Sequence, residues 1–134
     1  MRLKEKVAIV TGAANGIGAE ISRTFAREGC HVVLADLAAE QAAALAAEIT
    51  HSTGIKAISA CCNVAEKGDL QCVVDACVAE FGTVDILVNN AGITLPACPV
   101  EDISPERWLQ VLGIDLMGAI YGTQCVIPVM KAHR

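Results

Sequence analysis

The sequence has no run of basic residues, and its acidic residues outnumber its basic ones. It carries 10 Lys and Arg against 15 Asp and Glu, for a net charge of -5. Such a chain offers little to a phosphate backbone, so we expect no binding to nucleic acid. Charged residues make up only 19% and hydrophobic residues 54%, which excludes intrinsic disorder. The 134 residues suffice for one domain with a buried core.

Paired metal-binding cysteines are also missing. None of the seven cysteines forms a C-x-x-C pair and the three histidines are scattered, so we expect no metal site. The odd number argues against a complete set of disulfides. We therefore expect free, mostly buried thiols that act as small hydrophobic side chains, as in a reducing compartment.

Long hydrophobic runs are absent as well. The longest uncharged stretches, residues 86–100 and 116–130, are shorter than a bilayer span and are interrupted by asparagine, glutamine or proline. The positively charged start is followed by only residues 7–10 before a Thr-Gly pair, which is too short for the apolar core of a signal peptide. These features predict a soluble cytoplasmic protein that does not enter a membrane.

The chain does contain short apolar runs that alternate with longer helical stretches, without a linker or a repeat. Strands are predicted at residues 7–10, 31–35, 56–61 and 86–89. Helices are predicted from the first glycine turn to residue 29, and at about 38–52, 69–81 and 104–133, the last with Ser104 as N-cap. Strands of nearly continuous Val, Ile, Leu and Ala are typical of a parallel sheet buried on both faces. The predicted fold class is therefore α/β, with one doubly wound sheet between two helix layers.

Three glycines lie between the first strand and its helix, in the sequence TGAANGIG of residues 11–18. Gly12 permits a tight turn, Gly16 lets the backbone approach a pyrophosphate, and Gly18 lets the helix pack closely on the strand. A plain glycine turn is the less favoured interpretation in this strand–turn–helix context. Because the loop lacks a Gly-Lys-Ser/Thr ending, a nucleoside triphosphate P-loop is excluded. The motif predicts a Rossmann-type sheet, which is incomplete because the sequence offers four strands where the usual dinucleotide-binding sheet has about six.

Asp36 follows the second predicted strand, 18 positions after Gly18. A carboxylate at this point can accept hydrogen bonds from an adenosine ribose, and it would repel the 2′-phosphate of NADP, so we predict NAD as the cofactor. Alternatively, Asp36 merely caps the following helix.

The glycine loop, together with the sequence NNAG at residues 89–92, resembles the short-chain dehydrogenases/reductases, and the resemblance covers the whole chain. It implies a nicotinamide-dependent oxidoreductase that acts on an alcohol or carbonyl substrate and assembles into a homo-oligomer. The residues that it places around the diphosphate and ribose are Gly12, Asn15, Gly16, Ile17 and Gly18. It places Asp36 and Leu37 at the adenosine ribose, Asn63 and Val64 at the adenine, and a turn of Asn90, Ala91 and Gly92 beside the cofactor.

Three departures from the family pattern stand out. Asn63 occupies a position where the family usually has aspartate; its amide oxygen can still accept a hydrogen bond, or it satisfies only its own loop. Asp115 stands where the family commonly has asparagine, and we expect it to be a solvated or paired carboxylate rather than a catalytic group. The family's catalytic Ser and Tyr-x-x-x-Lys would follow residue 134. We therefore predict no catalytic residue within residues 1–134, and expect Tyr121 and Trp108 to be packed helix residues.

Three functions remain to be weighed. The favoured one is the cofactor-binding half of an NAD-dependent oxidoreductase. The alternative is a non-catalytic fragment that binds a dinucleotide or assembles with a partner. An S-adenosylmethionine methyltransferase is disfavoured, because those enzymes usually carry an acidic residue just before the glycines and lack the NNAG turn.

Overall fold

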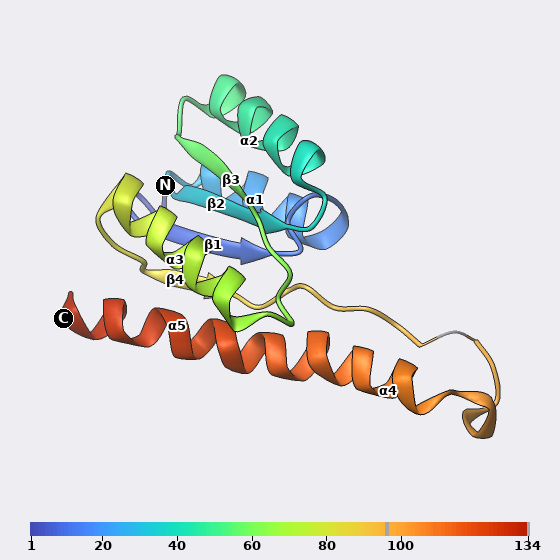
Figure 1. The fold of residues 1–134 in the computed structure, drawn as a ribbon. Coiled ribbons are helices and arrows are strands. Elements are labelled where there is room, and N and C mark those ends of the chain that lie inside the picture. Colours follow the sequence, from blue (N-terminus) through green and yellow to red (C-terminus); the bar gives the residue numbers. More distant parts are fainter. Residues whose placement is uncertain (96, 134) are drawn as a thin grey trace.

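Four short strands form one parallel sheet in the computed structural model, which describes residues 1–95 and 97–133. The strand order is β3-β2-β1-β4, as expected for a doubly wound fold (Figure 1). The strands are β1 (Val7–Thr11), β2 (His31–Asp36), β3 (Ala57–Cys61) and β4 (Ile86–Val88). The predicted fold class and all four predicted strands are confirmed, with ends that differ by one residue at most.

The two central strands are buried on both faces, which explains why residues 7–10 of β1 and residues 32–35 of β2 are all apolar. Ile9 of β1 aligns with Val33 of β2 and with Leu87 of β4. Ile9 and Val33 contact the helices on one face, whereas their neighbours Val10 and Leu34 contact those on the other. Successive side chains of a strand point to opposite faces, so in a sheet covered on both sides every position in the middle of a central strand is buried and favours an apolar residue.

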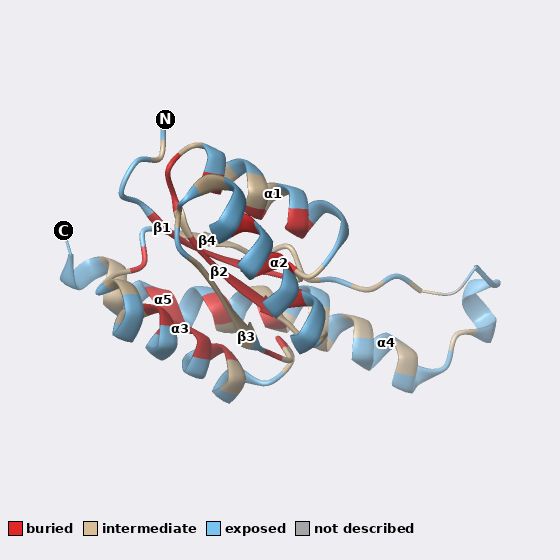
Figure 2. Ribbon diagram, turned by 90° about the horizontal axis from the view of Figure 1, so that it is seen from above, coloured by how far each residue is buried: buried red, intermediate tan, exposed pale blue. Residues whose placement is uncertain are grey.

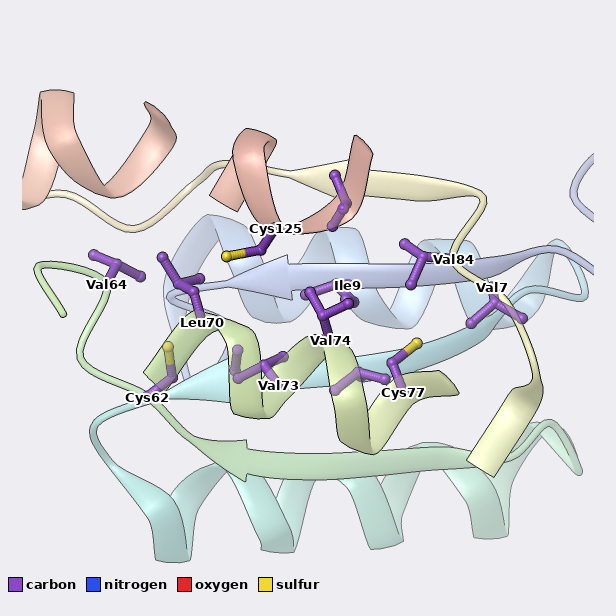
Figure 3. Packing of buried hydrophobic residues seen from close by; sticks show 13 residues of the cluster. Val7, Ile9, Cys62, Val64, Leu70, Val73, Val74, Cys77, Val84 and Cys125 are labelled. Atoms are coloured by element: carbon purple, nitrogen blue, oxygen red, sulfur yellow. The ribbon is translucent and has the colours of Figure 1, made fainter. Parts of the chain in front are cut away.

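Two pairs of helices cover the sheet, one pair on each face (Figure 1). On one face lie α1 (Gly16–Arg27) and α2 (Ala39–Thr53), which contribute mainly alanines to their core. On the other face lie α3 (Lys67–Phe81) and α5 (Gly118–Ala132). Figure 3 shows the second core, in which Ile9 is surrounded by valines and by the thiols of Cys77 and Cys125. The central strands β1 and β2 are buried between these layers, whereas β3 and β4 at the edges are only partly buried (Figure 2).

All seven cysteines are free, as the sequence predicted. Four of them are buried: Cys30, Cys62, Cys77 and Cys125. Burial raises the pKa of the Cys77 thiol to about 12, so it remains protonated and packs as a small apolar group. The remaining three, Cys61, Cys72 and Cys98, are exposed. The expectation that most of the thiols are buried is therefore met by four of the seven.

The predicted last helix has three parts. These are α4 (Pro105–Val111), a π-helical segment η2 (Leu112–Met117) and α5, preceded by a short 3-10 turn η1 (Val100–Asp102). The predicted start is confirmed, since the Ser104 hydroxyl accepts a hydrogen bond from the Arg107 amide at 3.3 Å. The π-helical segment was not predicted. The expectation that Trp108 anchors the helix is wrong, because its side chain is 38% exposed and α4 has no buried residue.

Glycines let α5 lie close to its neighbours. A Cβ atom at Gly118 would lie 2.8 Å from the Cγ2 atom of Val64, and one at Gly122 would lie 2.8 Å from the side-chain oxygen of Asn89. Residues 105–132 together form a helix that is long and apolar enough to cross a membrane, by length and composition alone; 22% of its most apolar window is buried. Its α5 part packs on α3 and β4 here, so its apolar residues serve the core at least in part.

We expect the 134-residue chain to self-associate at high concentration. In the described sheet β4 is an edge strand, and unpaired strand edges invite pairing with another molecule. Exposed Leu112, Leu116 and Ile120 also form an apolar stripe along the long helix. Light scattering should show a mass that rises with concentration.

The Leu116→Lys variant should lower this self-association, because it places a charge in the stripe. Val100→Lys is the matched control, because Val100 is also an exposed apolar residue but lies on η1, outside the stripe. The Val100→Lys variant should therefore self-associate as much as the unmodified chain. A monodisperse monomer at high concentration would contradict the prediction.

Candidate functional site

A pocket of about 400 Å³ opens at the carboxyl ends of β1, β2, β3 and β4, where their connecting loops meet. Every residue that the sequence predicted for the cofactor site lines it, except Gly18. The lining residues are Gly12, Asn15, Gly16, Ile17, Asp36, Leu37, Cys62, Asn63, Val64, Asn90, Ala91, Gly92, Ile93 and Ile114. No lysine or arginine belongs to this described lining.

The glycine loop exposes backbone at the start of α1. Gly16 has a φ of 55° and would meet no atom within 4 Å if it carried a Cβ, so this side of the loop faces open space. No acidic residue occupies the first turn of α1, and the Asn15 side chain makes no capping hydrogen bond. The first N–H groups of the helix and its positive pole are therefore free to bind an anion.

Gly18 lies behind the pocket rather than in it. A Cβ atom at this position would lie 2.3 Å from the carbonyl oxygen of Gly12 and 2.6 Å from the side-chain nitrogen of Asn90. The close packing that the sequence predicted at Gly18 is thus made against the glycine loop and the second motif. Its effect on a ligand would be indirect, through the position of Gly12.

Asp36 links the second strand to both neighbouring loops. Its carboxylate accepts one hydrogen bond from the Ala14 amide and one from the Ala38 amide, both at 2.9 Å. The alternative interpretation, that Asp36 caps the following helix, is wrong: α2 begins at Ala39 with Ala38 as its N-cap and has no side-chain capping hydrogen bond, so the bond to Ala38 only shapes the turn before the helix. Each carboxylate oxygen can accept more than one hydrogen bond, and Asp36 also lines the pocket, so its oxygens can still accept hydrogen bonds from a ligand.

The second motif is held against the first by the buried Thr11 hydroxyl. This oxygen accepts hydrogen bonds from the Asn90 and Ala91 amides, both at 3.0 Å, and donates one to the Val88 carbonyl. The Asn90 side chain in turn donates to the carbonyls of Thr11 and Gly12, at 3.0 and 3.2 Å. The sequence did not identify the bracing role of Thr11, which only the distance between the two motifs in space reveals.

The loop after β3 forms one wall of the pocket. The Asn63 side-chain oxygen accepts a hydrogen bond from the Ala65 amide at 3.1 Å, so Asn63 does satisfy its own loop, as the alternative interpretation expected. Burial raises the pKa of the neighbouring Cys62 thiol to about 12, which keeps it protonated. Cys62 therefore contributes an uncharged wall and no nucleophile.

At the far end of the pocket, the loop after β4 meets the π-helical segment. The Asp115 carboxylate accepts a hydrogen bond from the Ile93 amide at 2.8 Å, and it is exposed, so the expectation of a solvated or paired carboxylate fits. Ile93 and Ile114 line this end and were missed by sequence reasoning, since neither belongs to a motif. Tyr121 is partly buried against the core of α3 and α5, as predicted. Residues 1–95 and 97–133 contain no cluster of three or more metal-ligating side chains.

This arrangement matches a known family. The family model described as short chain dehydrogenase matches residues 6–134. The chain belongs to the short chain dehydrogenase family. The resemblance that the two glycine motifs suggested is therefore confirmed.

Individual family members are similar over nearly the whole chain. The chain is 45% identical over 125 residues to a D-threitol dehydrogenase of Mycolicibacterium smegmatis, covering 93% of this chain and 47% of that protein. It is 38% identical to a 3-oxoacyl-(acyl-carrier-protein) reductase of Thermotoga maritima, covering 100% and 54%. The crystal structure of a 3-ketoacyl-(acyl-carrier-protein) reductase from Brucella melitensis, complexed with NADH, has a TM-score of 0.91 and 34% identity, covering 98% of this chain and 52% of that one. The chain spans about half the length of the curated relatives it matches.

Proposed function

We propose that residues 1–134 form the cofactor-binding part of an oxidoreductase that transfers hydride between a nicotinamide dinucleotide and an alcohol or carbonyl substrate. The observation that carries this proposal is the pocket itself. It joins a free helix N-terminus, the Asp36 carboxylate and the Asn90 turn in one continuous cavity. Family membership and the NADH in the related Brucella melitensis structure support the same cofactor class.

The residues of the pocket fit such a cofactor by their chemistry. The loop at Gly12 and Gly16 and the N-terminus of α1 would bind the diphosphate, since they present backbone N–H groups without an intervening side chain. Asp36 would accept hydrogen bonds from the adenosine ribose, with Leu37 beside it and Asn63 and Val64 at the adenine. The bound nicotinamide would supply the hydride chemistry, whereas the chain orients it by the braced turn at Asn90.

We propose NAD rather than NADP as the cofactor. Asp36 lies in the pocket, and a carboxylate beside the ribose repels a 2′-phosphate. The described lining has no lysine or arginine that would bind this phosphate. In addition, Asp36 is held in place by two backbone amides, so it cannot easily turn away from a phosphate.

Calorimetry should show that the unmodified chain binds NAD more tightly than NADP. The Asp36→Ala variant should narrow this difference about tenfold or more, because it removes both the repulsion and charge-assisted hydrogen bonds worth roughly 1.5–3 kcal/mol each. Glu40→Ala is the matched control, since Glu40 is an exposed carboxylate in the first turn of α2 and does not line the pocket. Tighter binding of NADP by the unmodified chain would contradict the proposal.

A non-catalytic dinucleotide-binding or assembly module is the second candidate. The sequence of residues 1–134 contains no Tyr-x-x-x-Lys, and Tyr121 packs against the core instead of lining the pocket. Proton donation to a carbonyl would therefore need groups other than these residues. The exposed stripe on the long helix suits assembly into a homo-oligomer.

A cytoplasmic location and the absence of membrane insertion remain predictions of the sequence.

A further inference from the structure

One carboxylate, that of Asp36, lines the pocket, and a second, that of Asp115, lies behind the lining residues at the other end. Asp36 lies at one end, where the proposed function places the adenosine ribose. The glycine loop at Gly16 lies between the ends. The other end is formed by Gly92, Ile93 and Ile114, so a dinucleotide that follows the glycine loop from Asp36 would bring its second base here.

Asp115 places its charge against this second end. Its carboxylate accepts the hydrogen bond from the Ile93 amide at 2.8 Å, and its Oδ1 atom would lie 3.4 Å from a Cβ at Gly92. Both of these neighbours line the pocket, as does Ile114, which precedes Asp115 in the chain.

Among the described residues, 1–95 and 97–133, no cation forms an ion pair with this carboxylate. Arg107, on the same long helix, is directed elsewhere: its guanidinium donates to the Thr94 carbonyl at 2.9 Å and to the side chain of Gln110. The charge of Asp115 thus acts on whatever occupies the end of the pocket.

We propose that Asp115 makes the site favour the oxidised over the reduced nicotinamide dinucleotide. The inference rests on the proposed function, since it needs a nicotinamide at the Gly92–Ile93 end. The oxidised ring carries a positive charge and the reduced ring is neutral, whereas the diphosphate and the adenosine are the same in both. A nearby carboxylate therefore changes the ratio of the two affinities rather than both alike.

The position of Asp115 also explains why its charge can be tested separately from its hydrogen bond. An asparagine side chain has an oxygen that can accept from the Ile93 amide as the carboxylate does, but it has no charge. Asp115→Asn should therefore keep the turn in place and remove only the electrostatic effect. Asp115→Glu should keep the charge and is the rescue variant.

The test measures dissociation constants of NAD+ and NADH by calorimetry on the 134-residue chain. In Asp115→Asn, the preference for NAD+ over NADH should fall about two- to fivefold, which is what one charge exerts in largely aqueous surroundings. Asp115→Glu should retain most of the preference. Glu101→Gln is the matched control and should leave both affinities unchanged, because it removes one charge from the exposed turn η1, which does not line the pocket.

A second measurement keeps the proposal falsifiable if Asp115→Asn fails to fold. In the unmodified chain, the preference for NAD+ over NADH should become smaller as the salt concentration rises, because salt screens the exposed charge of Asp115. A ratio that is insensitive both to salt and to Asp115→Asn would overturn the proposal while leaving the proposed function intact. Failure of the unmodified chain to bind either form of the cofactor would instead overturn both.

Discussion

The Gly16→Asp variant is expected to fold normally and to lose roughly a hundredfold or more in affinity for NAD. A side chain at this position enters open space at the N-terminus of α1, where the proposed diphosphate site lies. A carboxylate there would occupy the positive end of the helix and repel the phosphates, and juxtaposed like charges cost several kcal/mol. Calorimetry with NAD measures the loss.

The fold should tolerate this change because of the backbone conformation of Gly16. Its φ of 55° lies in the left-handed region, which aspartate and asparagine enter more readily than most residues. Gly16→Asn is the matched control, since it has the same shape without the charge and should weaken binding much less. Equal losses in the two variants would mean that bulk, not charge, blocks the site. Undiminished binding by Gly16→Asp would show that the diphosphate lies elsewhere.

The Gly18→Ala variant is expected to lose about 3 kcal/mol of unfolding free energy, although alanine favours helices over glycine. The added Cβ would lie 2.3 Å from the Gly12 carbonyl oxygen and 2.6 Å from the Asn90 side-chain nitrogen. The first of these atoms is backbone, so the relief of the clash requires the glycine loop and α1 to move apart. Urea unfolding should show a lower midpoint, and NAD affinity should fall because Gly12 lines the pocket.

Gly68→Ala provides the matched control for this change. Gly68 lies in the first turn of α3, and an added Cβ there would meet nothing within 4 Å. The same substitution should therefore leave stability unchanged or raise it by up to about 1 kcal/mol. A similar loss of unfolding free energy in Gly18→Ala and Gly68→Ala would contradict the packing role assigned to Gly18.

Much of the fold follows from local sequence patterns. The strand that begins at His31 is almost entirely apolar, which predicts a position between two helix layers. In the structure, its residues contribute to the cores on both faces of the sheet. Helix ends at Gly54 and Gly82 were also predictable, since both residues adopt a left-handed conformation, with φ of 73° and 80°, that glycine enters without strain. These signals involve neighbours within a few positions in the chain.

Other features depend on contacts that no short pattern contains. The π-helical segment at Leu112–Met117 lies where the long helix leaves the domain body, and it brings Asp115 to the Ile93 amide. Trp108 was expected to be a packed residue of the long helix, but the described residues do not cover α4. Burial depends on what packs against a helix, which the composition of the helix alone does not state.

The sequence by itself determined the family, the alternation of strands and helices, and most of the residues around the pocket, but not Cys62, Ile93 and Ile114. It could do so because tight turns, helix N-termini and buried strands each require particular residue types at fixed spacings. Only the tertiary structure decided how the two motifs are joined. The Thr11 hydroxyl binds the turn at Asn90, some 79 positions later, and Gly18 supports both from behind. Hydrogen bonds and van der Waals contacts act over a few ångströms, so positions far apart in the chain become partners only after the strands align in the sheet.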